Sequence, residues 1–426
     1  MPAGVCKRHG DAVSGSLAVV NCRQLVTLRG PARPRVRSEI GEPGIIQDGA
    51  LLVRDGRISA AGSYAELKDR ISAGTEVVDA GGGVVLPGFV DAHTHLVFAG
   101  NRADEFELRI AGATYEQIAA AGGGIRATVR RTRETSEDDL LEAARRHARW
   151  FLAHGTTTVE AKSGYGLDVE TECKMLRVMR RLGSEGPLEI VPTFLGAHEV
   201  PEGCEREPYV DAVIGSMLPR VAAERLAEYC DVFCEPHIFP APAARRILQA
   251  ARGLGLGLRM HADQFTLSGG AKLAGELRTA TADHLEHTDA ESMDAMAAGG
   301  VQPVLLPGSV YALGLRGYAD ARAMIERGLA VVLATDFNPG SSPTASMPMV
   351  LSLACTQMRM TPAEALTAAT VNAAYSLGRG PQIGSLEAGK RANFVVYGCG
   401  DYREIPYHFG VNLVTGVWVR GAPAQL

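Results

Sequence analysis

The sequence "LPGFVDAHTH" at residues 86–95 decides which fold the chain is expected to adopt. An apolar run there leads into Asp91, His93 and His95, which stand at alternate positions. Side chains two residues apart lie on the same side of a β-strand, so the two imidazoles can bind one metal ion together. Asp91 lies on that side but deeper in the strand, which favours a structural role. The stretch therefore predicts a buried strand whose C-terminal end supplies half of a metal site.

Strand-like runs of this kind alternate with segments of helical pattern along most of the chain. The eight runs are residues 84–95, 156–166, 188–198, 230–237, 255–263, 281–287, 301–308 and 329–338. One intervening helix is clear, because Ser136 and Asp139 resemble a capping box and Gly155 can end the helix. His147 flanks its apolar stripe and is expected to be structural. The alternation indicates a parallel sheet, and eight units are typical of a (β/α)8 TIM-type barrel.

The segment after the first run is unusually long. The sequence "VFAGNRADEFELRIAGATYEQIAAAGGGI", residues 97–125, precedes the next clear helix. Its three consecutive glycines suggest a backbone that turns tightly or approaches a ligand. Loops of this length in compact domains are often functional.

Both ends of the chain show short strands with alternating apolar and polar residues between turns. Neither end is long enough to form a sound core alone. We therefore expect residues 1–83 and 380–426 to form one small β-sandwich-like domain, beside a barrel of residues 84–379.

The composition points to a cytoplasmic protein that binds neither nucleic acid nor membranes. The chain of 426 residues carries a formal net charge of −5, so it has no basic excess. Its eight cysteines include no CxxC pair, which fits a reducing compartment. The start of the chain has no apolar core typical of a secretory signal, and no apolar run is long enough to cross a membrane.

Polar residues collect where the predicted barrel strands end. Five histidines do so, namely His93, His95, His198, His261 and His284, and Asp336 ends the eighth strand. In a barrel of this type the C-terminal strand ends meet at one rim, where catalytic groups gather. His261 and Asp336 can complete the metal site that His93 and His95 begin. Three histidines and one carboxylate suit zinc or iron, whereas magnesium and calcium prefer oxygen ligands.

These motifs resemble a known group of enzymes. "LPGFVDAHTH", later strand-end histidines and a final "TD" resemble the amidohydrolase superfamily of metal-dependent hydrolases. The motifs "AGNR" with "AGATY", "KSGYGLD" and "TDFNPG" resemble one family within it, the imidazolonepropionase family, over about residues 84–380. The resemblance implies hydrolytic opening of the ring of 4-imidazolone-5-propanoate to N-formimidoyl-L-glutamate, a step of histidine degradation.

The resemblance also implies roles for individual residues. The metal ligands would be His93, His95, His261 and Asp336, holding one zinc or iron ion per subunit. The substrate site would be formed by Arg102, Tyr165, His198, Gln264, Asn338, Gly340 and Ser341. His284 would act beside the metal as a catalytic residue, and Asp336 would take the proton of the attacking water. Arg102 suits the substrate propionate, because a guanidinium binds a carboxylate with two hydrogen bonds.

Two features of the sequence bear on this assignment. The fourth strand run, "CDVFCEPH", has no lysine that could bridge two metals, so we expect one metal ion. Gln264 stands where some family members have glutamate, and glutamine cannot act as a base. Any proton transfer must then fall to Asp336 or His284.

Other functions remain possible from the sequence. One is a deaminase or another cyclic-amide hydrolase of the same superfamily, which would share the metal ligands. Another is a metal-free scaffold protein, although such a protein would have lost ligands that are all present here. The oligomeric state is not evident from the sequence, and a homodimer is common among large barrels of this kind.

Overall fold

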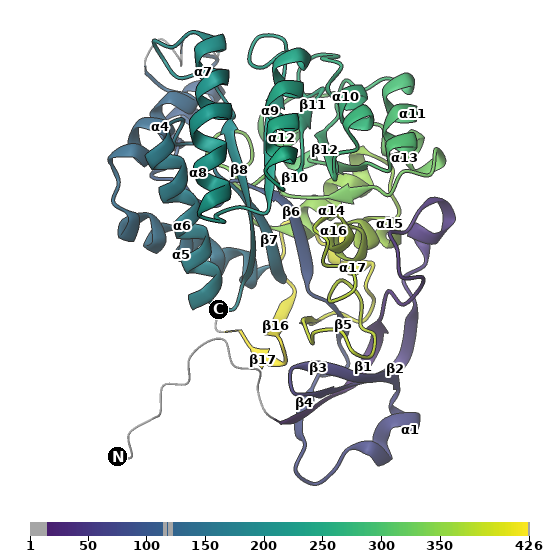
Figure 1. The fold of residues 1–426 in the computed structure, drawn as a ribbon. Helices are drawn as coiled ribbons and strands as arrows, with labels where there is room; N and C mark the ends of the chain where they lie inside the picture. The colour runs from purple at the N-terminus through teal and green to yellow at the C-terminus, as the bar shows by residue number, and fades with distance from the viewer. Residues whose placement is uncertain (1–14, 114–116, 118–121, 425–426) are drawn as a thin grey trace, which may run out of the picture.

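The computed structural model describes residues 15–113, 117 and 122–424. Its central feature is a parallel barrel (Figure 1). The strands, in sheet order, are β14 (Val332–Leu333), β13 (Gln302–Leu305), β12 (Thr281–His284), β11 (His261–Ala262), β9 (Tyr229–Cys234), β8 (Glu189–Ala197), β7 (Thr156–Lys162) and β6 (Phe89–Thr94), with β10 (Gly257–Leu258) beside β9. A parallel bridge between Thr94 and Phe337 joins the first strand to the segment after the last. The predicted (β/α)8 barrel is confirmed.

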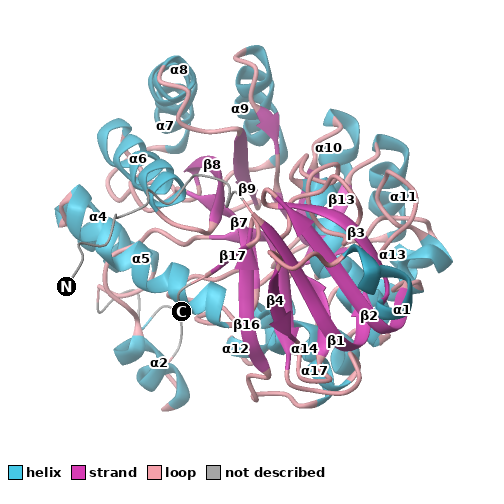
Figure 2. Cartoon of the chain, turned by 90° about the horizontal axis from the view of Figure 1, so that it is seen from below, coloured by secondary structure: helices cyan, strands magenta, loops and turns pink. Residues whose placement is uncertain are grey.

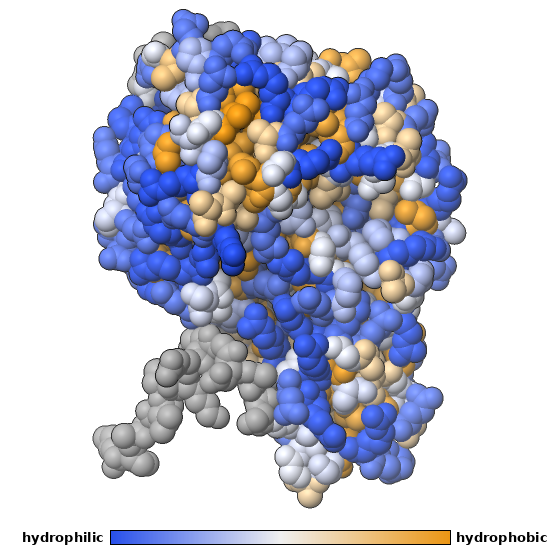
Figure 3. All heavy atoms as spheres, in the orientation of Figure 1, coloured by the Kyte–Doolittle hydropathy of each residue, from blue (hydrophilic) through white to orange (hydrophobic). Residues whose placement is uncertain are grey.

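Helices surround the barrel, as the view from below shows (Figure 2). They are α4 (Ile125–Glu134), α5 (Glu137–Ala153), α6 (Val169–Glu185), α7 (Arg206–Ala212), α8 (Leu218–Ala223), α9 (Ala241–Gly253), α10 (Gly270–Leu277), α11 (Ala290–Gly299), α12 (Pro307–Ala312), α13 (Ala321–Glu326), α14 (Met347–Gln357), α15 (Pro362–Thr367) and α16 (Ala373–Ser376). Two π-helical segments, η3 (Val213–Met217) and η4 (Ala368–Asn372), join α7 to α8 and α15 to α16. Hydrophilic residues cover most of the face in Figure 3, and apolar residues are visible between them over the barrel. No helix of the described residues is long and apolar enough to span a membrane.

Helix α5 follows its predicted signals. The Ser136 side chain accepts a hydrogen bond from the Asp139 backbone N–H, which caps the first turn. Leu140, Ala144 and Phe151 face the core. Gly155 then takes a φ of 86°, a left-handed conformation that glycine adopts easily.

A second sheet lies at one end of the barrel and draws strands from both ends of the chain (Figure 1). Its order is β17 (Ala422–Pro423), β16 (Val414–Val419), β15 (Phe394–Tyr397), β5 (Val84–Pro87), β1 (Ser16–Val26), β2 (Ile45–Arg54) and β3 (Arg57–Ser63), with β4 (Glu76–Asp79) paired to β1. Stacked rings of Phe394 and Trp418, with centroids 4.8 Å apart, tie β15 to β16. Short helical segments η1 (Arg37–Gly41), α1 (Tyr64–Leu67), η2 (Lys68–Arg70) and α17 (Glu404–Tyr407) lie in its connections.

The prediction of one strand over residues 84–95 is wrong. β5 pairs with β1 and β15 in the small sheet, and the barrel strand β6 begins only at Phe89. The break is at Gly88, where a Cβ atom would clash with the side chain of Thr157. The apolar run is continuous because both strands are fully buried, so hydrophobicity alone does not reveal the break.

The segment predicted as one long loop contains a helix, α2 (Ala103–Ile110). None of the α2 side chains is buried, although Phe106 and Ile110 are apolar residues at helical spacing. Arg109 reaches from α2 to the carbonyl oxygens of Ala312 and Gly340, at 3.3 and 3.4 Å. The end of the "AGATY" motif lies outside the described residues.

Candidate metal centre and active site

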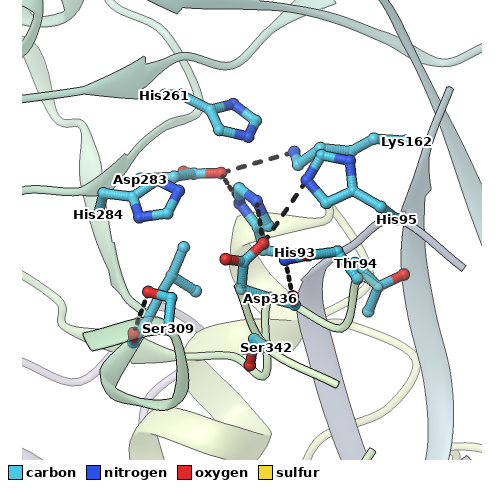
Figure 4. A network of polar contacts seen from close by, with 12 residues as sticks. His93, Thr94, His95, Lys162, His261, Asp283, His284, Ser309, Asp336 and Ser342 are labelled. Carbon is cyan, nitrogen blue, oxygen red and sulfur yellow. Dashed lines mark hydrogen bonds and ion pairs between the residues drawn. The ribbon is translucent and has the colours of Figure 1, made fainter. Parts of the chain in front are cut away.

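The four side chains predicted as metal ligands lie together at the C-terminal ends of the barrel strands (Figure 4). His93 belongs to β6 and His95 follows it, while His261 begins β11 and Asp336 follows β14. The Nε2 atoms of His93 and His95 lie 3.4 and 3.5 Å from Asp336 Oδ1. The rings of His93 and His261 are 4.5 Å apart between centroids. His284 joins them, because ligand atoms of His93, His261 and His284 all lie within 4.8 Å of one another.

The chemistry of these donors fits a metal ion. The Nε2 atoms of His93 and His261 are buried without a hydrogen-bond partner in the described part of the chain. Leaving buried polar atoms unpaired is costly, so such atoms call for a ligand. Burial lowers the pKa of His93 and of His95 well below the ordinary histidine value, which keeps both rings in the neutral form that binds metals. Imidazole nitrogens with one carboxylate suit zinc or iron.

A buried cluster of charged side chains behind the histidines was missed from the sequence. His93 Nδ1 lies 2.6 Å from Asp283 Oδ2, and His261 Nδ1 lies 3.1 Å from Asp231 Oδ2. The Lys162 ammonium lies 2.7 Å from Asp231 and 3.6 Å from Asp283. Charged residues within predicted strands, such as Lys162 in "TTTVEAK", were the available signal. Strand periodicity does not tell which partners such residues meet.

His284 and Asp336 have unusual backbone conformations. Their φ angles of 81° and 53° lie in the left-handed region, which residues with side chains rarely adopt. Burial alone would lower the pKa of His284, but the Glu286 carboxylate, 3.7 Å from Nδ1, leaves it raised. Burial raises the pKa of Asp336. Strained residues with shifted pKa values are typical of functional sites.

Tyr165 and His198 form one wall beside the histidines. The His198 ring stacks on His95 with centroids 4.9 Å apart, and the Tyr165 ring lies 5.7 Å from His95. His198 Nδ1 donates to the Gly164 carbonyl oxygen at 3.0 Å. Burial lowers the pKa of His198 to about 3, so its ring is neutral and Nε2 is an acceptor.

Arg102 directly precedes helix α2. The guanidinium is partly buried, and its Nε donates to Thr128 Oγ1 at 2.9 Å. A Cβ atom at Gly340 would clash with this guanidinium. The segment that holds Arg102 and the loop that holds Gly340 are therefore in close contact. The structure therefore brings Arg102 next to the loop that follows Asp336.

The Asn338 side chain organises that loop. Asn338 Oδ1 accepts from the backbone N–H groups of Gly340 and Ser341, at 2.8 and 2.7 Å. Its amide nitrogen donates to the Asp336 carbonyl oxygen at 2.6 Å and to Ser341 Oγ at 2.8 Å. Ser341 Oγ donates to Asp336 Oδ2 at 3.4 Å. Asn338 thus uses its amide group to shape the loop and to connect it to Asp336.

Gln264 lies in the loop after β11 and is partly buried. No hydrogen bond joins its side chain to another described residue. Its neighbours are held by the buried Glu235 carboxylate, which accepts from the Phe265 N–H at 2.9 Å and from Thr266 Oγ1 at 2.6 Å. The backbone next to Gln264 is therefore fixed, while no residue that the structure describes holds the side chain by a hydrogen bond.

Two models of the Amidohydrolase family match the chain, at residues 76–163 and 314–423. Solved structures of similar fold include an adenosine deaminase from Xanthomonas campestris with bound zinc and the guanine deaminase of E. coli. They are 19% and 16% identical to this chain, with TM-scores of 0.72 and 0.70. Each alignment covers 96% of this chain, with 93% of the first structure and 99% of the second. The family models thus point to the class of amidohydrolases, and the solved structures share the fold of the chain.

Curated relatives narrow this class. The chain is 61% identical to an imidazolonepropionase of Solibacter usitatus over 95% of its length and 97% of that relative. It is 49% identical to an imidazolonepropionase of Geobacillus kaustophilus over 93% of its length and 95% of that relative. The chain belongs to the imidazolonepropionase family.

Proposed function

We propose that the chain hydrolyses 4-imidazolone-5-propanoate to N-formimidoyl-L-glutamate, the ring-opening step of histidine degradation. One observation carries the proposal. In a chain of this family, a continuous set of contacts leads from the histidine cluster through Asp336 and Ser341 to Gly340 and the Arg102 guanidinium. Such a site offers a hydrolytic centre at one end and a carboxylate-binding group at the other, which matches a lactam ring that carries a propionate.

We propose one zinc or iron ion held by His93, His95, His261 and Asp336. When bound, the ion would polarise the lactam carbonyl and lower the pKa of water. Asp336 is suited to take the proton of the attacking water and to return it to the ring nitrogen as the C–N bond breaks. His284, which lies beside His93 and His261, is suited to stabilise the oxyanion that forms at the carbonyl oxygen.

The remaining residues would orient the substrate. The Arg102 guanidinium would bind the propionate, since a guanidinium and a carboxylate form paired hydrogen bonds. His198 offers an acceptor nitrogen, which suits a ring N–H better than the propionate. Tyr165 lies beside His95 and His198, where its ring can pack on the planar substrate. Asn338, Gly340 and Ser341 would hold the backbone against the ring, and Gln264 would orient the ring or the water.

Incubation of metal-loaded protein with 4-imidazolone-5-propanoate tests the reaction. We expect the ultraviolet absorbance of the ring to disappear, N-formimidoyl-L-glutamate to form, and a chelator to abolish both. Persistence of the ring, with ammonia released from an aminated heterocycle, would favour the deaminase alternative. Metal analysis of the active protein should give one equivalent per chain, and two equivalents at full activity would contradict a mononuclear site.

We further propose that the protein acts in the cytoplasm and forms a homodimer. All described cysteines are free thiols, which supports a reducing compartment. Analytical ultracentrifugation would distinguish a dimer from a monomer.

A further inference from the structure

We propose that Lys162 is a positioning residue, which fixes the orientation of two histidines of the metal centre through the carboxylates of Asp231 and Asp283. The inference rests on the proposed metal centre. It concerns side chains that lie behind the histidines, and Lys162 itself is not a ligand. Its ammonium has no lone pair to offer a metal ion.

Lys162 is fully buried and contacts three carboxylates. Its Nζ lies 2.9 Å from Glu160 Oε1, 2.7 Å from Asp231 Oδ2 and 3.6 Å from Asp283 Oδ2. Glu160, Asp231 and Asp283 are also fully buried. Three carboxylates placed together in a low-dielectric interior would repel one another without a cation between them.

Each aspartate contacts a different histidine. Asp283 Oδ2 lies 2.6 Å from His93 Nδ1, and Asp231 Oδ2 lies 3.1 Å from His261 Nδ1. Asp231 Oδ1 also accepts from the His261 backbone N–H at 3.1 Å. A carboxylate at Nδ1 fixes the tautomer and the ring plane, so that Nε2 is free for a metal. In both histidines Nε2 is indeed buried without a partner among the described residues.

Arg259 is the second cation of the cluster, but it cannot replace Lys162. Its guanidinium donates to the carbonyl oxygens of Ala92 and Ser376, at 2.7 and 3.3 Å. It approaches Asp283 only to 3.9 Å. Lys162 is therefore the cation that contacts both histidine-bound carboxylates, and one ammonium sets the positions of two rings from different strands.

Three variants test this role through metal binding, without substrate. The variant Lys162→Met leaves one cation with three carboxylates. The double variant Glu160→Gln with Lys162→Met has the same net charge in the cluster as the wild type, but no ammonium. Glu160→Gln alone keeps Lys162 between Asp231 and Asp283 and serves as the control. Zinc affinity would be measured by competition with a chelator, and the geometry by the visible spectrum of the cobalt-substituted protein.

If Lys162 positions the ligands, both variants without the ammonium should bind zinc roughly 10–100-fold more weakly and show altered cobalt spectra. Glu160→Gln should stay close to the wild type. Recovery of zinc affinity in the double variant would overturn the proposal, because charge balance alone would then explain the effect. Wild-type affinity and spectrum in Lys162→Met would overturn it as well.

Circular dichroism of the apo proteins checks that each variant folds. If Lys162→Met does not fold, the charge-matched double variant decides the question. A wild-type protein that binds no zinc or cobalt would refute the proposed metal centre itself, and the role of Lys162 with it. A wild type that binds metal, with variants that bind equally well, would refute the role of Lys162 alone.

Discussion

His284 ends strand β12 with a left-handed backbone conformation that the other residues of the strand do not share. Its left-handed φ of 81° turns the side chain toward the cluster, where its ring lies 5.5 Å from His93 and 5.3 Å from His261. A side chain that stabilises charge only in the transition state should affect turnover more than substrate binding.

The variant His284→Ala tests this role. We expect kcat to fall by about 10²–10⁴-fold with little change in KM, because a proton-transferring or oxyanion-stabilising group is lost. Steady-state kinetics of the metal-loaded variant would measure both constants. Near-normal turnover would contradict the catalytic assignment, and unchanged metal content would show that His284 is not a ligand.

Arg102 should show the opposite pattern. The variant Arg102→Gln removes the charge proposed to bind the propionate, and we expect KM to rise by about 10–100-fold while kcat changes less. Arg130→Gln is the matched control, since Arg130 is exposed on the neighbouring helix α4. An equal effect of the two variants on KM would point to general electrostatics rather than to a specific contact.

At the residue scale, the sequence predicted that the strand-end histidines lie close together. It did not predict the carboxylates that contact them. His93 and His95 were evident because a strand with two-residue periodicity must bring them to one side. The pairing of Asp283 with His93 and of Asp231 with His261 joins strands far apart in sequence. No local pattern records such pairs. The roles assigned to the metal ligands and substrate residues stay predictions until they are tested.

At the scale of elements, the strands of the barrel were predictable and the connection at its entrance was not. All eight predicted runs overlap a barrel strand, because alternating strands and helices leave few topologies. The break at Gly88 depends on how closely the backbone approaches Thr157, which is a tertiary contact. Helix α2 was also missed: it lies in a segment that was interpreted as one loop, and none of its side chains packs in the core.

Helix α5 carries a buried histidine that makes the fold sensitive to acid. His147 stacks on Phe98 with centroids 4.6 Å apart, and its Nδ1 donates to the Leu96 carbonyl oxygen at 2.9 Å. Burial lowers the pKa of His147 to about 4, below the value of about 6.5 in an unfolded chain. Between these two values the unfolded state binds the proton and the folded state does not. This histidine therefore lowers stability progressively as the pH falls from about 6.5 to about 4.

Replacement of His147 tests the effect. The free energy of unfolding of the apo protein should fall between pH 7.5 and pH 5 by about 2 kcal/mol more in the wild type than in His147→Gln. Urea denaturation at the two pH values would measure it. Equal losses in the wild type and His147→Gln would contradict the prediction.

At the scale of the whole molecule, the small sheet and the active site lie at opposite ends of the barrel. The Tyr397 ring of β15 packs 6.4 Å from Phe89, the first residue of β6, while His93 and His95 come at the end of that strand. Strands from both chain ends thus close the base of the barrel and leave its other rim to the loops that carry the chemistry. The domain boundaries at residues 83/84 and 379/380 stay a prediction.

The proposed metal centre spans the line where the barrel closes. His93 and His95 come from the first barrel strand and Asp336 follows the last. The backbone links between these segments are the Thr94–Phe337 bridge and hydrogen bonds from His95 N to Phe337 O at 2.8 Å and from Asp336 N to His93 O at 3.1 Å. The Asp91 carboxylate adds two hydrogen bonds, accepting from Thr335 N at 3.1 Å and from Thr335 Oγ1 at 2.7 Å. A bound ion would add a further connection through the metal ligands. Loss of the ion should therefore destabilise the contacts between the first and last barrel segments more than the rest of the barrel.

Metal removal tests this at two levels. Binding of an ion to the folded state alone stabilises it by about 4 kcal/mol when the free ion exceeds its Kd about 1,000-fold, so chelation should lower Tm by several degrees. Hydrogen exchange should rise most at residues 89–97 and 332–338, which meet at the closure, and least in the small sheet. A Tm independent of added zinc or iron would contradict the proposed site. A uniform rise in exchange would instead mean that the ion stabilises the barrel as a whole, because local opening at the closure would then be no easier than global unfolding.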